Sequence, residues 1–345
     1  HRDDLTRINY QEGMGDMRDK ADRLQKLTEA IGKDWGFTAE EAADADRAAF
    51  LSKSDLATGM VTEFTELQGE MGKEYALLDG EKPEVAQAIF EQYMPRFAGD
   101  ILPEQEIGRA LSLADKLDNL AATFLRGLIP TGSQDPFALR RQTIGAVNIL
   151  TDGKIHWDIR RGIEAALALL PGDEETKKTV LSQIEDFFRQ RIKAIMLDEG
   201  IAYDIIDAVL AGPVDDIYAL FLKARSMAES QLKDEAELRQ AVTRLANITK
   251  GKTGGKVDPS LFTEDVEKKL QDAFEAVSAK ALPLFASYEY GKALPALKEL
   301  TAPINDYLDN VMVMVDDEAV KNNRISQLLA TLALFNTWGD FSKLV

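Results

Sequence analysis

Side chains that can bind phosphate or hydrogen-bond to a nucleic-acid base gather in a few short stretches of this 345-residue sequence. Arginine can donate two bonds to one acceptor face, and asparagine both donates and accepts, so both suit base edges. Lysine suits the phosphate backbone, which it attracts without reading sequence. Residues that could make such contacts include Arg140, Arg141, Arg244, Asn247, Lys250, Lys252, Lys256 and Arg324.

The segment 250–256 is rich in glycine and lysine, and its Gly251-Lys252-Thr253 matches the end of a phosphate-binding P-loop. That motif requires a glycine where Ala246 stands, and it follows a strand, whereas this segment follows a helical pattern. We therefore reject a P-loop. Two interpretations remain open: a flexible connection between helices, or a loop whose three lysines meet phosphates.

Composition limits where such a site can lie. The formal net charge is −18, hydrophobic residues make up 45% and charged residues 29%. An acidic protein is a poor general binder of nucleic acid, so an RNA site must be a local basic patch on an acidic body, and we expect no DNA partner. No apolar run approaches the roughly 20 residues that span a membrane, and no secretory leader is visible. We expect a cytoplasmic protein with no membrane partner.

Several chemistries are excluded by the residues that the sequence lacks. There is no cysteine, which rules out disulfides, thiolate catalysis and zinc bound by cysteine. The only two histidines are His1 and His156, which are far apart in the sequence. An imidazole-rich metal centre therefore cannot be built from this chain, and we expect neither a bound metal nor a bound cofactor.

The spacing of apolar residues predicts an all-α protein without a convincing alternating strand. Thr38 and Glu41 form a capping box, Pro83 restarts a helix, and Asp135 before Pro136 predicts another helix start. Between the apolar residues of 180–195 lie Arg189, Arg191 and Lys193, which form either a solvated face or a basic strip. We expect three parts: a helical domain over 1–150, a helical connector over 151–213 and a helical bundle over 214–345.

Three motifs, in the same order, resemble the β subunit of the bacterial two-subunit glycyl-tRNA synthetase. The first is Ala114-Asp115-Lys116 with Asp118, followed by Pro130-Thr131-Gly132-Ser133 and by Asp-Pro-Phe-Ala-Leu-Arg-Arg at 135–141. The second is Leu-Ser-Lys-Ser-Asp-Leu at 51–56, continuing to 72. The third is Asp-Asn-Val-Met-Val-Met at 309–314, followed by Asn322-Asn323-Arg324. Because the family's subunit is much longer and this chain starts with His1, we expect a fragment that matches its C-terminal half.

The resemblance implies a degenerate His-Asp (HD) phosphohydrolase domain over 1–150. In an active domain a His-Asp pair and a later Asp hold metals; the matching positions here are Ser54, Asp55 and Asp115, so the histidine is absent. Two carboxylates alone hold a hard cation weakly. Either the two aspartates are structural, bonded to backbone or to Lys53 and Lys116, or they keep a residual metal or nucleotide site.

The resemblance also implies the activity. It predicts an α-helical anticodon-binding domain over 214–345, in which Arg244 and Asn247 fill one family pattern and Arg324 another. The chain would hold glycine tRNA as part of a heterotetramer, while the α subunit carries the aminoacylation site and uses ATP and Mg²⁺. The chain itself is expected to have no catalytic residue.

Two other functions stay open: a metal-dependent phosphohydrolase using Asp55 and Asp115, and a non-catalytic helical scaffold. We also expect Met312 and Met314 to be core residues of a helix running through Val311. The aromatic residues that could stack on bases, Tyr288, Tyr290, Phe335 and Trp338, are expected to be mostly core.

Overall fold

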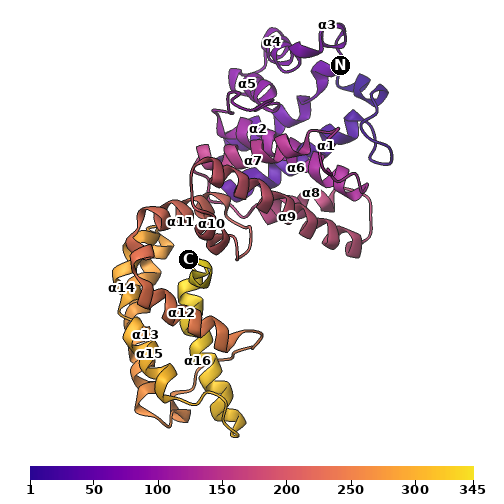
Figure 1. Cartoon of the computed structure of the whole chain (residues 1–345). Coiled ribbons are helices and arrows are strands. Elements are labelled where there is room, and N and C mark those ends of the chain that lie inside the picture. The colour runs from indigo at the N-terminus through magenta and orange to yellow at the C-terminus, as the bar shows by residue number, and fades with distance from the viewer. The chain divides into compact units, whose positions relative to one another are not determined.

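The computed structural model describes all 345 residues and contains helices, with only three isolated β-bridges and no sheet. The predicted all-α class is therefore confirmed. The chain forms two compact units, which are described separately. Unit 1 consists of His1–Ile192 and Val214–Tyr218, and unit 2 of Lys193–Pro213 and Ala219–Val345. Figure 1 shows both units as packed helices joined by short connections.

The helices of unit 1 begin where the sequence supplies capping groups. Asp16 caps the first α-helix through a capping box, and the predicted box of Thr38 and Glu41 is confirmed. Pro83 is the first residue of its helix, also as predicted. The α-helices are α1 (Met17–Trp35), α2 (Ala39–Leu51), α3 (Gly59–Glu63), α4 (Glu70–Leu78), α5 (Pro83–Glu91), α6 (Glu106–Leu125), α7 (Leu139–Asp152), α8 (Ile159–Ala168) and α9 (Glu174–Asp198), with 3₁₀-helices η1 (Asp3–Arg7), η2 (Ser54–Ala57) and η3 (Thr65–Leu67).

Helix α6 is the centre of unit 1. It packs against α1, α2, α5, α7 and α8, and nearly every residue from Ile107 to Phe124 is buried. A helix surrounded on all sides must satisfy its polar side chains from its neighbours, since water does not reach them. The buried charged residues of α6, Asp115, Lys116 and Asp118, are therefore expected to bond to side chains or backbone of the surrounding helices.

Unit 2 is a second helical bundle. Its α-helices are α10 (Tyr203–Val209), α11 (Ile217–Glu229), α12 (Ala236–Thr249), α13 (Asp265–Ala286), α14 (Leu294–Lys298), α15 (Thr301–Asn310) and α16 (Glu318–Asn336), with 3₁₀-helices η4 (Gln231–Asp234), η5 (Pro259–Leu261), η6 (Tyr290–Ala293) and η7 (Phe341–Lys343). Helix α12 packs on α15 and α16, and α13 packs on α15 and α16 from another side. Tyr307, Phe335 and Trp338 are fully buried, and the indole N–H of Trp338 donates to the Lys223 carbonyl and the Ser226 hydroxyl of α11.

Two local predictions were wrong. The helix predicted through Val311 and Met314 ends at Asn310, because the chain becomes extended at Val311 (φ −110°, ψ 120°). The helix predicted to start directly after Asp135 begins at Leu139, although Asp135 does cap it: its carboxylate accepts from the backbone N–H groups of Leu139 and Arg140 at 2.8 and 2.9 Å. The left-handed conformation of Ala138 delays the first turn.

The segment 151–213 is divided between the two units rather than forming a third one. Residues 151–192 belong to unit 1 and residues 193–213 to unit 2. Within unit 2, the backbone N–H of Asp340 donates to the Ala208 carbonyl at 2.9 Å, and the N–H of Val345 donates to Asp204 at 3.2 Å. These bonds tie the last residues of the chain to the helix α10.

Candidate functional site

The carboxylates of helix α6 are bonded to cations from elsewhere in unit 1. Asp115 lies 2.9 Å from the Nζ of Lys20 and 3.0 Å from the Nζ of Lys53. Asp118 lies 2.9 Å from Lys20 and accepts from the Nε of Arg23 at 2.6 Å. All five side chains are buried. The two ammonium groups therefore neutralise Asp115 within the protein, without a bound metal.

Burial alone would raise the pKa of Asp115, but the adjacent charges of Lys20 and Lys53 outweigh it and hold the pKa well below its usual range. Lys116 is in the opposite situation, because its Nζ donates only to the Met94 carbonyl and the Ser112 hydroxyl, each at 2.7 Å. Burial lowers the pKa of Lys116 to about 7, against the attraction of Asp115. The sequence prediction named Lys53 and Lys116 as possible partners; the structure places Lys53 against Asp115 but not Lys116.

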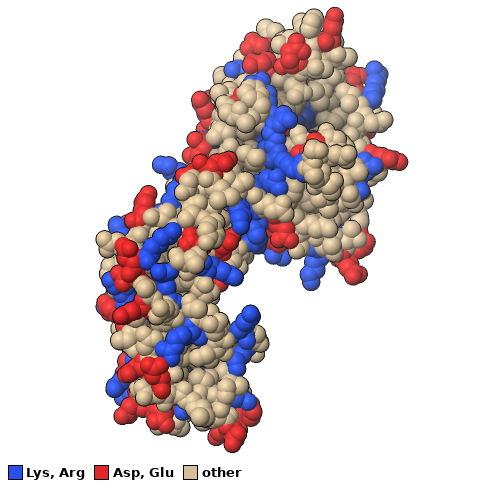
Figure 2. All heavy atoms as spheres, viewed as in Figure 1, with Lys and Arg blue, Asp and Glu red and all other residues tan.

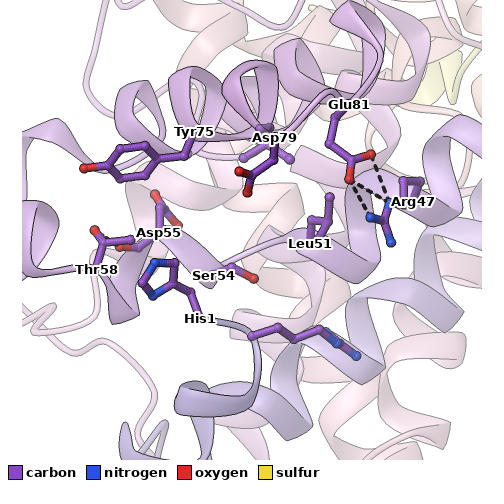
Figure 3. Close-up of a pocket in the computed structure, with 13 residues that line it drawn as sticks. His1, Arg47, Leu51, Ser54, Asp55, Thr58, Tyr75, Asp79 and Glu81 are labelled. Carbon is purple, nitrogen blue, oxygen red and sulfur yellow. Dashed lines mark hydrogen bonds and ion pairs between the residues drawn. The ribbon is translucent and has the colours of Figure 1, made fainter.

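Asp55 is bonded separately from Asp115. Its carboxylate accepts from the backbone N–H of Gly69 at 2.6 Å and from the hydroxyl of Tyr93 at 3.0 Å. A cavity of about 380 Å³ lies beside it. Figure 3 shows Ser54, Asp55 and His1 on one side of this cavity and Tyr75 and Asp79 on the other.

The arrangement is unsuited to a two-metal hydrolase. No group of three or more His, Asp or Glu side chains stands close enough to hold a metal ion. Of the two cations that meet Asp115, Lys53 was predicted from the sequence and Lys20 was not. The available signal was that Lys20 and Arg23 lie three residues apart in helix α1 among the buried residues Ala21, Leu24 and Leu27.

Arg140 and Arg141 stand at the start of α7, beside a groove of about 340 Å³. The guanidinium of Arg140 donates to the Gly132 carbonyl at 2.8 Å, and that of Arg141 donates to the Arg96 carbonyl at 3.3 Å. The same groove is lined by Phe97 and Asn148. Figure 2 shows basic side chains gathered over the part of unit 1 where α6 and α7 lie, while acidic side chains occupy other parts of this face.

Arg191 and Lys193, from the strip considered above, are held by local partners. The guanidinium of Arg191 stacks 4.9 Å from the ring centre of Phe187, and the Nζ of Lys193 lies 2.6 Å from Asp207. Burial and the nearby charge of Arg140 lower the pKa of Arg191.

In unit 2 the candidates lie along the C-terminal part of α12 and the loop after it. Asn247 and Lys250 are exposed, and Arg244 donates to Asn305 at 3.0 Å and to Asp309 at 2.5 Å. In the loop, Lys256 is exposed, and the Nζ of Lys252 lies 3.1 Å from the Sδ of Met314. The basic residues Arg244, Lys250, Lys252 and Lys256 together form what we call the cationic edge of the bundle.

The structure corrects the prediction that Arg324 contacts RNA. This residue is only 4% exposed, so it does not face an RNA ligand. Its guanidinium donates to both carboxylate oxygens of the fully buried Glu267, to the Thr263 hydroxyl and to the Met312 carbonyl, at 2.7 to 3.2 Å. With all these donors used inside the bundle, Arg324 connects α16 to the start of α13 and to the segment after α15.

The methionine prediction is also corrected: Met312 is 73% exposed and Met314 is 56% exposed. The expectation for the aromatic residues is confirmed. Phe335, Trp338 and Tyr290 are buried, and Tyr288 is partly exposed. None of the three buried rings can stack on a base without leaving the core.

The class of these helical bundles is given by comparison with known proteins. Residues 238–339 match the family model described as the DALR anticodon binding domain. Residues 1–211 match the model described as the glycyl-tRNA synthetase beta subunit. The chain belongs to the glycyl-tRNA synthetase beta subunit family.

Curated relatives carry the same description. The chain is 44% identical over 342 residues to the glycine–tRNA ligase beta subunit of Clostridioides difficile, and 40% identical over 345 residues to that of Desulforamulus reducens. It is 40% identical over 343 residues to that of Haemophilus influenzae. These alignments cover 99% of this chain, whereas the chain spans about half the length of these relatives. None of the helices has the length and hydropathy needed to cross a membrane.

Proposed function

We propose that this chain is the tRNA-binding, C-terminal half of a glycine–tRNA ligase β subunit. It holds glycine tRNA so that the 3′ end reaches an aminoacylation site on the α subunit, in a cytoplasmic heterotetramer. ATP and Mg²⁺ act at that α-subunit site. The contribution of this chain is binding and orientation, which turn a bimolecular reaction into a positioned one.

The observation that carries this proposal is the match of residues 238–339 to an anticodon-binding domain, together with the cationic edge that these residues form. Arg244 pairs with Asp309 at the surface, where an ion pair contributes little stability, so an RNA phosphate can replace the carboxylate at small cost. Lys250, Lys252 and Lys256 supply further charge for phosphates. Arg140 and Arg141 offer a second set of contacts in unit 1.

We further propose that residues 1–150 are an HD domain that has lost its chemistry. The aspartates at the matching positions, Asp55 and Asp115, are bonded to Tyr93 and backbone in one case and to two lysines in the other. A metal ion at Asp115 would have to displace two buried ammonium groups that already satisfy it. These bonds argue against the phosphohydrolase alternative at Asp115.

The test is a titration of the full-length protein with glycine tRNA and with a non-cognate tRNA at two salt concentrations. Tighter binding of glycine tRNA, weakening as salt increases, is the expected result, because neutralised phosphates release counterions. Equal affinity for both tRNAs would contradict specific recognition. Absence of tRNA binding together with retained binding to the α subunit would favour the scaffold alternative.

A further inference from the structure

The segment between α15 and α16 presents two methionines to solvent. Its sequence, Val-Met-Val-Met at 311–314, is extended at its start, so successive side chains point to opposite sides. Val311 and Val313 are buried at 7% exposure each, whereas Met312 and Met314 are the exposed pair. Two large apolar side chains are therefore exposed two residues apart on one segment of the bundle.

The segment is held in place from within the bundle. Arg324, buried against Glu267, donates from Nη1 to the Met312 carbonyl at 2.8 Å. Asp317 ends the segment by accepting from the backbone N–H groups of Ala319 and Val320 at the start of α16. The exposed methionines are therefore on a positioned backbone, which reduces the entropy lost when a ligand binds.

The loop that follows α12 lies against α16 and brings a cation to the same place. The backbone N–H of Gly255 donates to the Ser326 hydroxyl at 2.8 Å, and Asp258 and Asn323 exchange two hydrogen bonds of 2.7 and 2.9 Å. A Cβ at Gly254 would meet the Cδ1 of Leu329 at 2.9 Å and the Cα of Ser326 at 3.3 Å, so the loop backbone approaches α16 closely at this residue. From this anchored loop Lys252 extends to the thioether of Met314.

We infer that Met312 and Met314 form an apolar edge on which an unstacked base of the bound RNA packs, while Lys252 meets the phosphate beside that base. This inference rests on the proposed function and identifies residues within it. A thioether is polarisable and makes favourable contacts with aromatic rings, which the faces of bases provide. RNA loops are recognised through such splayed bases, and buried rings of this bundle cannot supply the contact.

Charge favours RNA over a protein as the occupant. The carboxylate of Asp309 is paired with Arg244 and that of Glu318 with Lys321, which leaves Asp316 and Asp317 as the nearby acids without an ion pair, against three lysines in the loop. The loop is anchored to α16 and carries Lys250, Lys252 and Lys256, of which Lys252 contacts Met314. An apolar surface bordered by lysines suits a stacked base with its phosphate.

The experiment compares glycine tRNA affinity of the full-length protein with that of a double variant, Met312→Ala with Met314→Ala. We expect the affinity to fall by about two- to tenfold for each methionine. The dependence of affinity on salt should not change, because no phosphate contact is lost. Lys252→Ala should instead reduce the slope of log affinity against log salt by slightly less than one.

Two controls separate the contact from other effects. Leu282→Ala removes a side chain of α13 that is 51% exposed and should leave tRNA affinity unchanged. Met312→Leu with Met314→Leu keeps the apolar surface and should retain most of the affinity. A 2-aminopurine placed in the anticodon loop should change fluorescence on binding to the unaltered protein, and less so with the alanine variant.

The results that would contradict the inference can be distinguished from those that would contradict the proposed function. If the unaltered protein binds glycine tRNA and the alanine double variant binds it equally well, this inference fails while the proposed function stands. If that variant binds tRNA normally but no longer binds the α subunit, the edge is a protein interface and the inference is overturned. If the unaltered protein does not bind tRNA, the proposed function fails and the inference with it.

Discussion

Single charged residues in this protein have roles that follow from their burial. Arg324 and Arg244 were both predicted to contact RNA, yet one is inside the bundle and the other is at its surface. A buried ion pair that loses one partner leaves an uncompensated charge in a poorly solvated place. A surface pair contributes less than about 1 kcal/mol.

For Arg324 we therefore expect a loss of stability rather than a specific loss of binding. Arg324→Ala should lower the free energy of unfolding by about 3–5 kcal/mol, because Glu267 stays buried without its partner. Urea denaturation monitored by circular dichroism measures this change. Arg244→Ala is the matched control: it should change stability by less than about 1 kcal/mol and weaken tRNA binding. Equal stability of the two variants would contradict the distinction.

Lys116 should make stability depend on pH. Burial lowers its pKa to about 7 in the folded chain, from an ordinary value of 10.5. Between these values the unfolded chain binds a proton that the folded chain does not, so stability should rise with pH from about 7 to about 10. The pKa of Lys53 is also lowered, first by burial, and adds in the same direction.

The variant Lys116→Met should flatten this rise, since it removes the titrating group. Urea midpoints measured at several pH values between about 7 and 9.5 give the slope. Lys26→Met, at an exposed position of α1, should keep the slope of the unaltered protein. An unchanged slope in Lys116→Met would show that this lysine is not the group responsible.

At the scale of elements, the start of α7 connects a cap to a pair of candidate RNA contacts. Asp135 accepts from the N–H groups of Leu139 and Arg140, and the Arg140 guanidinium reaches back to Gly132. Hydrogen bonds therefore connect Asp135, the loop before α7 and the side chain of Arg140. The loop 130–138 is fixed by this arrangement rather than by a regular first turn.

Asp135→Ala should destabilise the protein by about 1 kcal/mol, because the first two backbone N–H groups of α7 lose their acceptor, and should also weaken tRNA binding because Arg140 loses its fixed position. Thermal unfolding and tRNA titration on the same sample measure both effects. Asp135→Asn keeps one of the two accepting oxygens and should fall between Asp135→Ala and the unaltered protein. If tRNA affinity is unchanged in Asp135→Ala, the arginines at the start of α7 are not RNA contacts.

At the scale of the whole molecule, the chain passes between the two units more than once. Residues 193–213 belong to unit 2, yet 214–218 belong to unit 1. Ile205 and Ile206 of α10 are buried, and Ala208 bonds to Asp340 near the chain end. The C-terminal bundle is thus completed by residues that precede the predicted boundary at 214.

We expect a fragment of residues 193–345 to be more stable than one of residues 214–345. The shorter fragment loses the apolar surface that α10 covers, and burying one large apolar side chain stabilises by roughly 1.5–3 kcal/mol. The urea midpoints of the two purified fragments compare their stabilities. Equal midpoints would mean that α10 contributes nothing to unit 2, and would support a boundary at 214.

The sequence by itself determined the helical class, several helix starts and the family. Capping boxes, prolines at first helical positions and apolar spacing are local, so Thr38, Pro83 and the apolar face of 180–195 could be interpreted without knowing their neighbours. The family motifs were equally visible. The absence of the histidine at Ser54 was also visible, but the sequence left open whether Asp55 and Asp115 are structural or keep a residual metal site.

Only the tertiary structure decided what those residues meet. Lys20 reaches Asp115 across 95 positions of sequence, and Arg324 reaches Glu267 across 57. Periodicity shows which side of a helix is apolar, but it does not show which element packs against it. The prediction for Met312 and Met314 was wrong for the same reason. It assumed a helix through Val311, whereas the segment is extended there and buries Val311 and Val313 while exposing the two methionines.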